Sequence, residues 1–225
     1  MRSQRHWQAE PRSHIIMERE YVLASGNQGK LREIVAMLKP LGFVVRPQSD
    51  WRVPEADESA GTFIENALIK ARQAAKFTGL ASIADDSGLV VPVLNGLPGI
   101  YSARYAGAEA DDEANKRKLL TELSGRRGKE RCAYFICAMV LVQSADDPAP
   151  LLAIGRWHGQ VLDSPRGLGG FGYDPLFGIA GAESGDPQRS AAELSPAEKS
   201  RVSHRGQALR ELVRQIRERD EGFIA

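Results

Sequence analysis

The chain has 225 residues, of which 42% are hydrophobic and 26% are charged, a composition typical of one globular domain or of one domain built as two lobes. Thirty Lys and Arg residues against 29 Asp and Glu residues leave a formal net charge of +1. This balance argues against a protein that coats nucleic acid through its overall electric field, although a local cluster of basic residues could still bind a small anion.

The longest apolar run extends from Cys132 to Val142, which is too short to cross a bilayer and is typical of a strand buried on both faces. We therefore expect no association with a membrane. Cys132 and Cys137 should point to opposite faces of this strand, so a disulfide between them is not expected. Free thiols favour a reducing, cytoplasmic setting.

The first 16 residues are polar and lack the apolar core of a secretory signal. We expect a disordered extension over residues 1–18, a single domain over 19–220 and a short tail over 221–225.

In the first half of the chain, hydrophobic periodicity predicts strands that alternate with helices. Residues 20–25 form a short strand, a helix follows over 29–39, and residues 43–47 offer a second strand. Thr62 followed by Glu65 is the pattern of a capping box, which predicts a second helix to about Phe77. The apolar stripes of the two helices are Leu31, Ile34, Val35 and Leu38, and Phe63, Ala67, Ala71 and Ala74 or Ala75.

In the second half, the predicted elements are mostly strands and loops. Residues 80–94 suggest a buried strand, an acidic turn and a further strand, and residues 96–107 resemble a loop. The remaining predictions are a helix over 111–123, a hairpin of strands over 132–142 and 150–162, a glycine-rich loop over 164–178, and a short helical turn before a long final helix. Alternating strands and helices followed by antiparallel strands predict an α/β or α+β sheet with a smaller lobe against it, and a cleft between lobes is a natural ligand site.

The loop between the first strand and the first helix resembles a phosphate cradle. A helix N-terminus offers unpaired N–H groups, its glycines let the backbone approach phosphate oxygens, and Lys30 adds a positive charge. The spacing does not match the P-loop, which has four residues between its glycines and Ser or Thr after its Lys. The alternative is an ordinary turn between a strand and a helix. The candidate phosphate-binding residues are Ser25, Gly26, Asn27, Gln28, Gly29 and Lys30.

Asp85 and Asp86 form a second candidate feature, because paired carboxylates at the end of a strand suit a hard cation such as Mg²⁺. Consecutive strand residues point in opposite directions, so we expect one Asp to face the cleft and the other to cap the turn. A plain surface turn is the alternative. Glu58 could supply a second carboxylate to such a cation. The alternative is that the acidic stretch around Glu58 is a solvated loop.

Two further features lie toward the C-terminus. Phe171 stands among glycines and could stack on a nucleobase, while Tyr173 or Asp174 could read a polar base edge; alternatively, the two aromatic residues only anchor the loop. Ser203 is a plausible N-cap that places His204 and Arg205 in the first turn of the last helix. With Lys199 just upstream, these residues either face an anion or carbonyl group or are exposed to water. The four features together describe a nucleoside triphosphate site.

Six stretches of the chain closely resemble the inosine triphosphate pyrophosphatase family, in the order of that family and from about Tyr21 to about Ile216. They are LASGNQGKLRE, TFIENALIKAR, ADDSGL, LPGIYSARYAG, GGFGYDPLF and SHRGQAL. The resemblance implies a long twisted mixed β-sheet flanked by helices, with two lobes and an active-site cleft between them. It also implies a homodimer that uses Mg²⁺ to hydrolyse ITP, dITP and XTP to the monophosphate and pyrophosphate, cleansing the nucleotide pool.

The resemblance assigns a role to each matching residue. Asp86 would be the proton acceptor and a metal ligand, Glu58 the second metal ligand, and Lys70 a phosphate neighbour. Phe171 would lie against the purine face. The other substrate contacts would be Ser25 to Lys30, Ser87, Gly172, Tyr173, Asp174, Lys199, His204 and Arg205.

The mechanism expected from these roles is an in-line attack of water on the α-phosphorus, with the charge of the leaving pyrophosphate held by Lys30, Mg²⁺ and loop amides. A carboxyl group beside a cation should have a lowered pKa, which makes Asp86 a weak base whose positioning role could matter more. Arg205 can only donate hydrogen bonds, so it should favour the 6-carbonyl of inosine over the 6-amine of adenine.

Three alternatives remain open. A Maf-like nucleotide pyrophosphatase would need an Arg-rich segment after Ser25, which is not present. A catalytically silent nucleotide-binding module would not need the carboxylates. Nucleic-acid binding through the arginines of the last helix is disfavoured because acidic residues interleave with them. The arginines are residues 210, 214, 217 and 219, and the acidic residues are Glu211, Glu218, Asp220 and Glu221.

Overall fold

The computed structural model of the chain describes residues 20–180 and 187–222. The extension expected over residues 1–18 lies outside these residues, as do residues 223–225 of the expected tail.

Among the described residues, seven strands form one open mixed sheet in the order β2-β1-β3-β4-β5-β6-β7. β1 is parallel to β2 and β3, whereas every other neighbouring pair is antiparallel. The strands are β1 (Glu20–Ala24), β2 (Val44–Pro47), β3 (Ser82–Val90), β4 (Cys132–Val142), β5 (Leu151–Val161), β6 (Phe177–Ala180) and β7 (Pro187–Ser190). This arrangement confirms the predicted mixed sheet.

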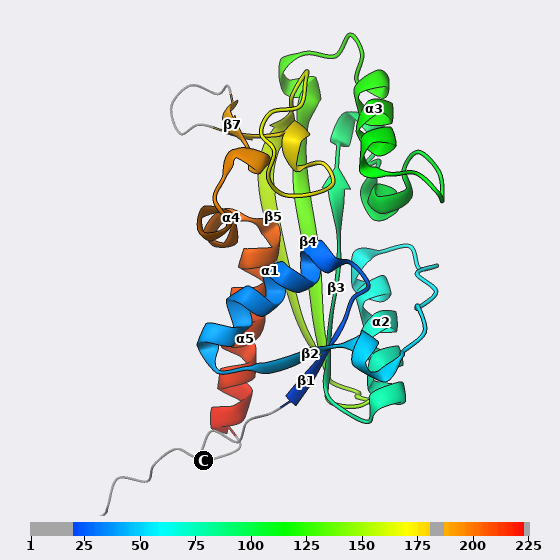
Figure 1. The fold of residues 1–225 in the computed structure, drawn as a ribbon, viewed down its shortest axis with the longest axis vertical. Helices are drawn as coiled ribbons and strands as arrows, with labels where there is room; N and C mark the ends of the chain where they lie inside the picture. The colour runs from blue at the N-terminus through cyan, green and yellow to red at the C-terminus, as the bar shows by residue number, and fades with distance from the viewer. Residues whose placement is uncertain (1–19, 181–186, 223–225) are drawn as a thin grey trace, which may run out of the picture.

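Helices flank the sheet on both sides, with α1 and α5 on one side of the long strands and α2 on the other (Figure 1). α3 lies beside the upper end of the sheet in that view. The helices are α1 (Gln28–Leu38), α2 (Phe63–Thr78), α3 (Asp112–Glu122), α4 (Pro196–Val202) and α5 (His204–Gly222). None of the helices in the described part of the chain is long and apolar enough to span a membrane.

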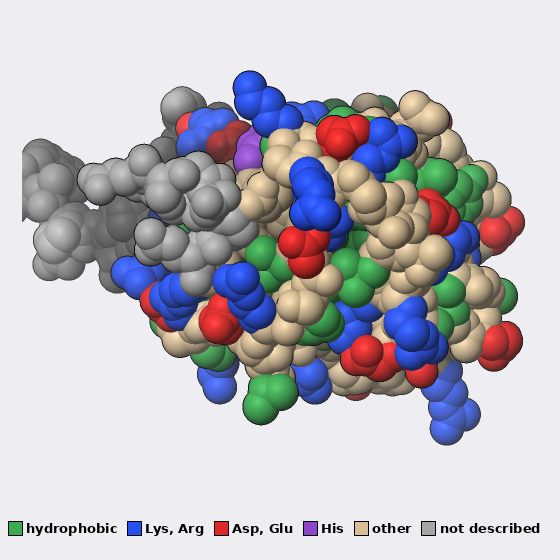
Figure 2. Space-filling view, turned by 90° about the horizontal axis from the view of Figure 1, so that it is seen from above, with side chains coloured by type: hydrophobic (Ala, Val, Ile, Leu, Met, Phe, Trp, Pro, Cys, Tyr) green, Lys and Arg blue, Asp and Glu red, His purple; other side chains and the backbone are tan. Residues whose placement is uncertain are grey.

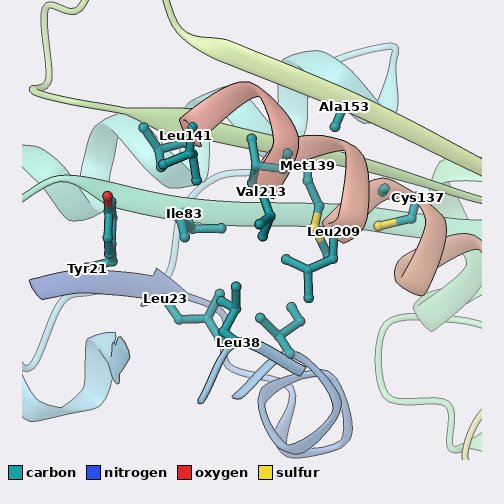
Figure 3. Close-up of a cluster of buried hydrophobic side chains, with 14 of the residues drawn as sticks. Tyr21, Leu23, Leu38, Ile83, Cys137, Met139, Leu141, Ala153, Leu209 and Val213 are labelled. Atoms are coloured by element: carbon teal, nitrogen blue, oxygen red, sulfur yellow. The ribbon is translucent and has the colours of Figure 1, made fainter. Parts of the chain in front are cut away.

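The two faces of the sheet belong to separate hydrophobic cores, because successive strand residues point in opposite directions. Leu23 and Ile83 pack with Leu209 in the core beneath α1 and α5 (Figure 3). Val22 and Ala84, their neighbours in sequence, pack against the alanine-rich face of α2. The sheet therefore carries side chains to both of its faces along the same central strands.

Capping residues set the helix starts that the sequence predicts. The side chain of Thr62 accepts a hydrogen bond from the N–H of Glu65 at the start of α2, and that of Asp111 accepts one from Ala114 at the start of α3. Each cap satisfies an N–H group that has no partner within the helix. The cysteines also follow the prediction, since both are free, with Cys137 buried and Cys132 exposed.

The expected acidic turn at Asp85-Asp86 is wrong. β3 runs without a break from Ser82 to Val90, and the two residues pair with Met139 and Ala138 of β4. Acidic residues are depleted in strands, which is why the sequence suggested a turn. Here their carboxylates meet cationic side chains from distant elements, and this pairing offsets the cost of burying them.

Two more differences concern the segments before and after the central strands. The glycine-rich stretch is not a loop to residue 178, because a 3-10 helix and then β6 begin within it, and β7 follows after the undescribed residues. Residues 96–107 are not only a loop, because they contain the 3-10 helix η4 (Gly99–Arg104). Together with α3, η4 forms a small second lobe whose core is separate from that beneath α1 and α5.

Candidate active site

A cavity of about 310 Å³ is bounded by the loop after β1, the middle of β3, α2, the η4–α3 lobe, the loop after β5 and the start of α5. We call residues 164–173, the loop after β5, the aromatic loop. Gln28 and Gly29 are predicted site residues that do not line the cavity. Those that do are Ser25, Gly26, Asn27, Lys30, Glu58, Lys70, Asp86, Ser87, Phe171, Gly172, Tyr173, Asp174, Lys199, His204 and Arg205.

The loop after β1 is organised by its own side chains. Asn27 caps α1 by accepting a hydrogen bond from the N–H of Lys30 at 3.0 Å, and Ser25 Oγ accepts one from the N–H of Asn27 at 3.3 Å. Gly29 serves packing, because a Cβ atom there would lie 2.8 Å from the ring of Phe171. The capped helix end and Lys30 both border the cavity, so an anion there would meet a positive charge.

Asp86 lies on the α2 side of β3. Its Oδ1 accepts the N–H of Ser87 at 3.0 Å, and Asn66 donates to its Oδ2 at 3.4 Å. Lys70 Nζ lies 3.4 Å from Asp86 and 3.1 Å from Glu58, so one ammonium group bridges the two predicted metal ligands. Burial raises the pKa of Asp86 against the opposing charges of Lys70 and Lys30.

The donor set around Lys70 is compatible with a magnesium ion. No group of three or more His, Cys, Asp or Glu side chains that could hold a metal occurs within residues 20–180 and 187–222. Mg²⁺ does not need such a group, because it keeps several waters and commonly uses one or two carboxylates plus substrate phosphates. Asp86 and Glu58 supply two carboxylates that already share a cation.

Asp85 faces the opposite side of β3 and is buried. Its Oδ2 lies 3.3 Å from Lys30 Nζ and 3.4 Å from Arg205 Nε. Burial opposes the charge of this carboxylate, but Lys30 and Arg205 outweigh it and hold the pKa of Asp85 well below its ordinary value. Asp85 therefore neither caps a turn nor lines the cavity; it pairs the lysine of the loop with the arginine of α5.

Glu33 is a site residue that the sequence reading missed. This residue of α1 pairs with Arg205 and, at 2.7 Å, with Lys199. Lys199 is also 2.7 Å from Asp174, so four elements of the chain meet in one buried network of alternating charge. The available signal was its position three residues after Lys30, which places both side chains on neighbouring positions of one helix.

Phe171 projects between the cationic groups and α1. Its ring centroid lies 4.9 Å from Lys199 Nζ and 5.7 Å from the guanidinium carbon of Arg205. Asp174 accepts the N–H of Phe171 at 2.9 Å, which links the ring to the ion-pair network. Tyr173 is buried and donates its hydroxyl proton to the carbonyl oxygen of Ser102 at 2.9 Å, so it also anchors the loop to η4.

His204 and Arg205 are buried, which contradicts the reading that they are exposed to water. Ser203 caps α5 by accepting a hydrogen bond from the N–H of Gly206 at 3.1 Å. The imidazole of His204 stacks on Phe135 with ring centroids 4.8 Å apart. Burial and then the charge of Arg205 lower the pKa of His204 well below its ordinary value, so the imidazole is neutral near pH 7.

The η4–α3 lobe contributes two side chains that the sequence reading also missed. Arg104 lines the cavity and donates to the carbonyl oxygen of Glu58 at 3.4 Å. Asp112, in the first turn of α3, accepts the N–H of Gly172 at 2.7 Å. Neither residue type indicated a role in the site. Arg104 lay in a predicted loop, and Asp112 resembled an ordinary acidic residue at a helix start.

These groups divide the cavity into two chemical regions. One region has Lys30, Lys70 and Arg104 beside the carboxylates of Asp86 and Glu58, which suits a polyphosphate and a divalent cation. The other has the ring of Phe171 above donor groups of Lys199 and Arg205, which suits a flat heterocycle with an acceptor on its edge. The residues of the two regions are Lys30, Lys70, Arg104, Asp86, Glu58, Phe171, Lys199 and Arg205.

Comparisons with known proteins identify the family of the chain. The sequence pattern of the Ham1 family matches residues 21–215. A dITP/XTP pyrophosphatase of Thioalkalivibrio sulfidiphilus is 54% identical over 198 residues, which cover 88% of this chain and 98% of that protein. A dITP/XTP pyrophosphatase of Vibrio cholerae is 50% identical over 200 residues, covering 89% and 98% of the two chains.

Solved structures show the same fold. A HAM1 protein from Coxiella burnetii superposes with a TM-score of 0.80 at 46% identity, over 89% of this chain and 99% of that one. The Staphylococcus aureus Ham1 protein superposes with a TM-score of 0.76 at 37% identity, over 89% and 100%. The resemblance inferred from the six sequence stretches is thereby confirmed.

Proposed function

The chain belongs to the Ham1 family, and on that basis we propose that it acts on non-standard purine nucleoside triphosphates such as dITP, XTP and ITP. It is a nucleoside-triphosphate pyrophosphatase, a hydrolase that releases the nucleoside monophosphate and pyrophosphate. Such an enzyme cleanses the nucleotide pool by destroying these triphosphates.

One observation carries the assignment of the site. A single cavity places the capped start of α1 and Lys30 at one region and Phe171 with Lys199 and Arg205 at another. A nucleoside triphosphate has the same two parts, an anionic chain and a flat base. The cavity therefore accommodates both parts of the substrate with groups of matching chemistry.

In the proposed mechanism, the chain itself supplies charge and a proton acceptor. Lys30 and Arg104 bind phosphate oxygens and stabilise the charge that develops on the leaving pyrophosphate. Asp86 accepts a proton from the water that attacks the α-phosphorus. Glu58 and Asp86 would hold Mg²⁺, which when bound supplies positive charge to the triphosphate.

Base selection is proposed to follow from the donor groups beside Phe171. Burial lowers the pKa of Arg205, but the charges of Asp85 and Glu33 outweigh burial and raise that pKa above its ordinary value, so the guanidinium keeps its proton. Arg205 and Lys199 can donate hydrogen bonds but cannot accept them. A 6-carbonyl can accept a further hydrogen bond from such donors, whereas the 6-amine of adenine sets a donor against them, which can cost a factor of about 10⁴ at a dedicated site.

The direct test is product analysis with ITP, ATP and GTP at matched concentrations, with Mg²⁺ and with EDTA. We expect metal-dependent IMP and pyrophosphate from ITP, little product from ATP, and loss of turnover in Asp86→Asn and Glu58→Gln. GTP shares the 6-carbonyl of ITP, so its turnover tests whether a further contact excludes the 2-amino group of guanine. Asp57→Asn is the matched control, since Asp57 is exposed and lies next to Glu58 in sequence. Binding of ITP without turnover in the wild type would instead favour the silent binding module.

A nucleic-acid-binding role has no support from the last helix. Arg214 pairs with Glu211 and Glu218 on the same helix, so its charge is locally balanced. The face shown in Figure 2 likewise mixes Lys and Arg with Asp and Glu. Balanced surfaces of this kind do not attract a polyanion strongly.

Two further proposals concern the cellular compartment and the oligomeric state. The free thiols of Cys132 and Cys137 support a reducing compartment, for which we propose the cytoplasm. We propose a homodimer, supported by the exposed apolar residues Leu152 and Ile154 on one face of β5. Light scattering should give a mass twice that of the 24.6 kDa chain. Replacing both Leu152 and Ile154 with Lys should reduce the measured mass to that of a single chain.

A further inference from the structure

The aromatic loop is fixed to the rest of the molecule by hydrogen bonds at several points along its length. Phe171 donates its N–H at 2.9 Å to Asp174, the residue that follows the loop. The N–H of Gly169 is bonded to the carbonyl oxygen of Ala192 at 3.2 Å. The N–H of Gly172 is bonded at 2.7 Å to Asp112, a residue of α3 that is 60 positions away in sequence. This bond joins the loop to the second lobe, together with the bond from the Tyr173 hydroxyl to Ser102. Gly172 and Asp112 both line the cavity.

Side-chain packing does not hold Gly172 in place. Its φ is +59°, a left-handed conformation that favours glycine, and a Cβ atom built on it would meet nothing within 4 Å. A hydrogen bond from a backbone N–H to a carboxylate is stronger than one between neutral groups. The bond to Asp112 therefore holds the backbone of Gly172 directly, and Gly172 follows Phe171 in the chain.

We propose that Asp112 is a positioning residue that holds Gly172, and through it the ring of Phe171, in the orientation that binds the purine. The inference rests on the proposed function, in which Phe171 stacks on the base. Asp112 acts through the loop backbone and does not take part in the chemical step. The role is specific to the base, because the groups that face the triphosphate lie on other elements.

The position of Phe171 leaves little room for error. Its ring lies so close to α1 that a Cβ on Gly29 would come within 2.8 Å of it, and its centroid lies 4.9 Å from Lys199 Nζ. A purine that stacks on this ring must also reach the donors of Lys199 and Arg205. A loop that loses its tie to α3 would present the ring in several orientations, and only some of them allow both contacts.

The test compares Asp112→Ala, Asp112→Asn and Asp111→Ala with the wild type. Asn keeps a side-chain oxygen that can accept the N–H of Gly172, whereas Ala keeps none. Asp111→Ala is the matched control, because Asp111 caps α3 through Ala114 and is adjacent to Asp112 but does not contact the aromatic loop. Calorimetry measures binding of the α,β-methylene analogue of ITP, which needs no turnover, and of tripolyphosphate, which has no base.

We expect Asp112→Ala to weaken binding of the ITP analogue about tenfold, the effect of losing one hydrogen bond to a charged group. Its affinity for tripolyphosphate should stay within about twofold of the wild type, and Asp112→Asn should recover most of the analogue affinity. Asp111→Ala should lower the melting temperature through the lost cap but leave both affinities unchanged.

The outcomes separate this inference from the proposed function. Wild-type affinity for the analogue in Asp112→Ala overturns the positioning role and leaves the pyrophosphatase intact. Equal loss in Asp111→Ala also overturns it, because destabilising α3 would then suffice. Equal loss of tripolyphosphate binding overturns its specificity for the base. A wild type that binds tripolyphosphate but not the analogue contradicts the proposed substrate itself.

Discussion

Replacing Asp85 with Asn should destabilise the fold and weaken catalysis together. The carboxylate of Asp85 is 1% exposed and lies 3.3 Å from Lys30 and 3.4 Å from Arg205. Asn fills nearly the same space but carries no charge, so two buried cations lose a shared counter-ion. The substitution thus tests the charge network without creating a cavity.

The magnitude follows from the surroundings of the two cations. Removing one partner of a buried ion pair costs about 3–5 kcal/mol. Arg205 keeps its pair with Glu33, so we expect the lower end, about 3 kcal/mol. For a chain of this size, each kcal/mol lowers the melting temperature by about 2–4 °C, which predicts a drop of about 6–12 °C. Lys30 also loses the group that orients it at the cavity, so the KM for the triphosphate should rise.

Thermal unfolding followed by circular dichroism, together with steady-state kinetics on ITP, measures both effects. Glu20→Gln is the matched control, because Glu20 pairs with Arg46 at an exposed position and should cost less than about 1 kcal/mol. A change of 2 °C in melting temperature corresponds to about 0.5–1 kcal/mol for a chain of this size. If Asp85→Asn melts within 2 °C of the wild type, the account of the buried network is refuted.

Other predictions concern packing, stacking and pH. Phe171→Ala should raise the KM for ITP about tenfold or more, since base stacking contributes about 1–3 kcal/mol, whereas Phe171→Tyr should not. Gly155→Ala should cost about 3 kcal/mol in unfolding free energy, because its Cβ would lie 2.0 Å from the carbonyl oxygen of His204; Gly61→Ala, with nothing within 4 Å, is the control. Because burial lowers the folded-state pKa of His204, the unfolded chain binds the extra proton, so stability should fall by about 1.4 kcal/mol per pH unit below about pH 6.5. His204→Asn should remove this fall of stability with pH in thermal melts between pH 7.5 and 5.5. An unchanged pH dependence in the variant would contradict burial of a neutral imidazole.

The sequence predicted those parts of the fold that have local signals. Thr62 and Asp111 cap the helices they were expected to start, and the apolar run over 132–142 forms the central strand β4. These features depend on neighbours within a few positions, so periodicity and capping patterns reveal them.

The parts that were missed depend on contacts between distant residues. β3 continues through Asp85 and Asp86 only because Lys30, Lys70 and Arg205 are brought to the two carboxylates by three other elements. Nothing near these aspartates in sequence indicates those partners, and acidic pairs usually favour turns.

The candidate site shows the same division. Residues within distinctive stretches, such as Lys30 and Phe171, could be proposed from the sequence. Glu33, Arg104 and Asp112 were not proposed, because each is a common residue type that gains its role from a partner 46 to 172 positions away.

The most direct test of the central claim is hydrolysis of ITP in water enriched in oxygen-18, with mass spectrometry of both products. Attack on the α-phosphorus predicts one heavy oxygen in the phosphate of IMP and none in the pyrophosphate. Label in the pyrophosphate would place the attack on the β-phosphorus, and labelled orthophosphate would place it on the γ-phosphorus. Either result would contradict the roles assigned to Asp86 and Lys30.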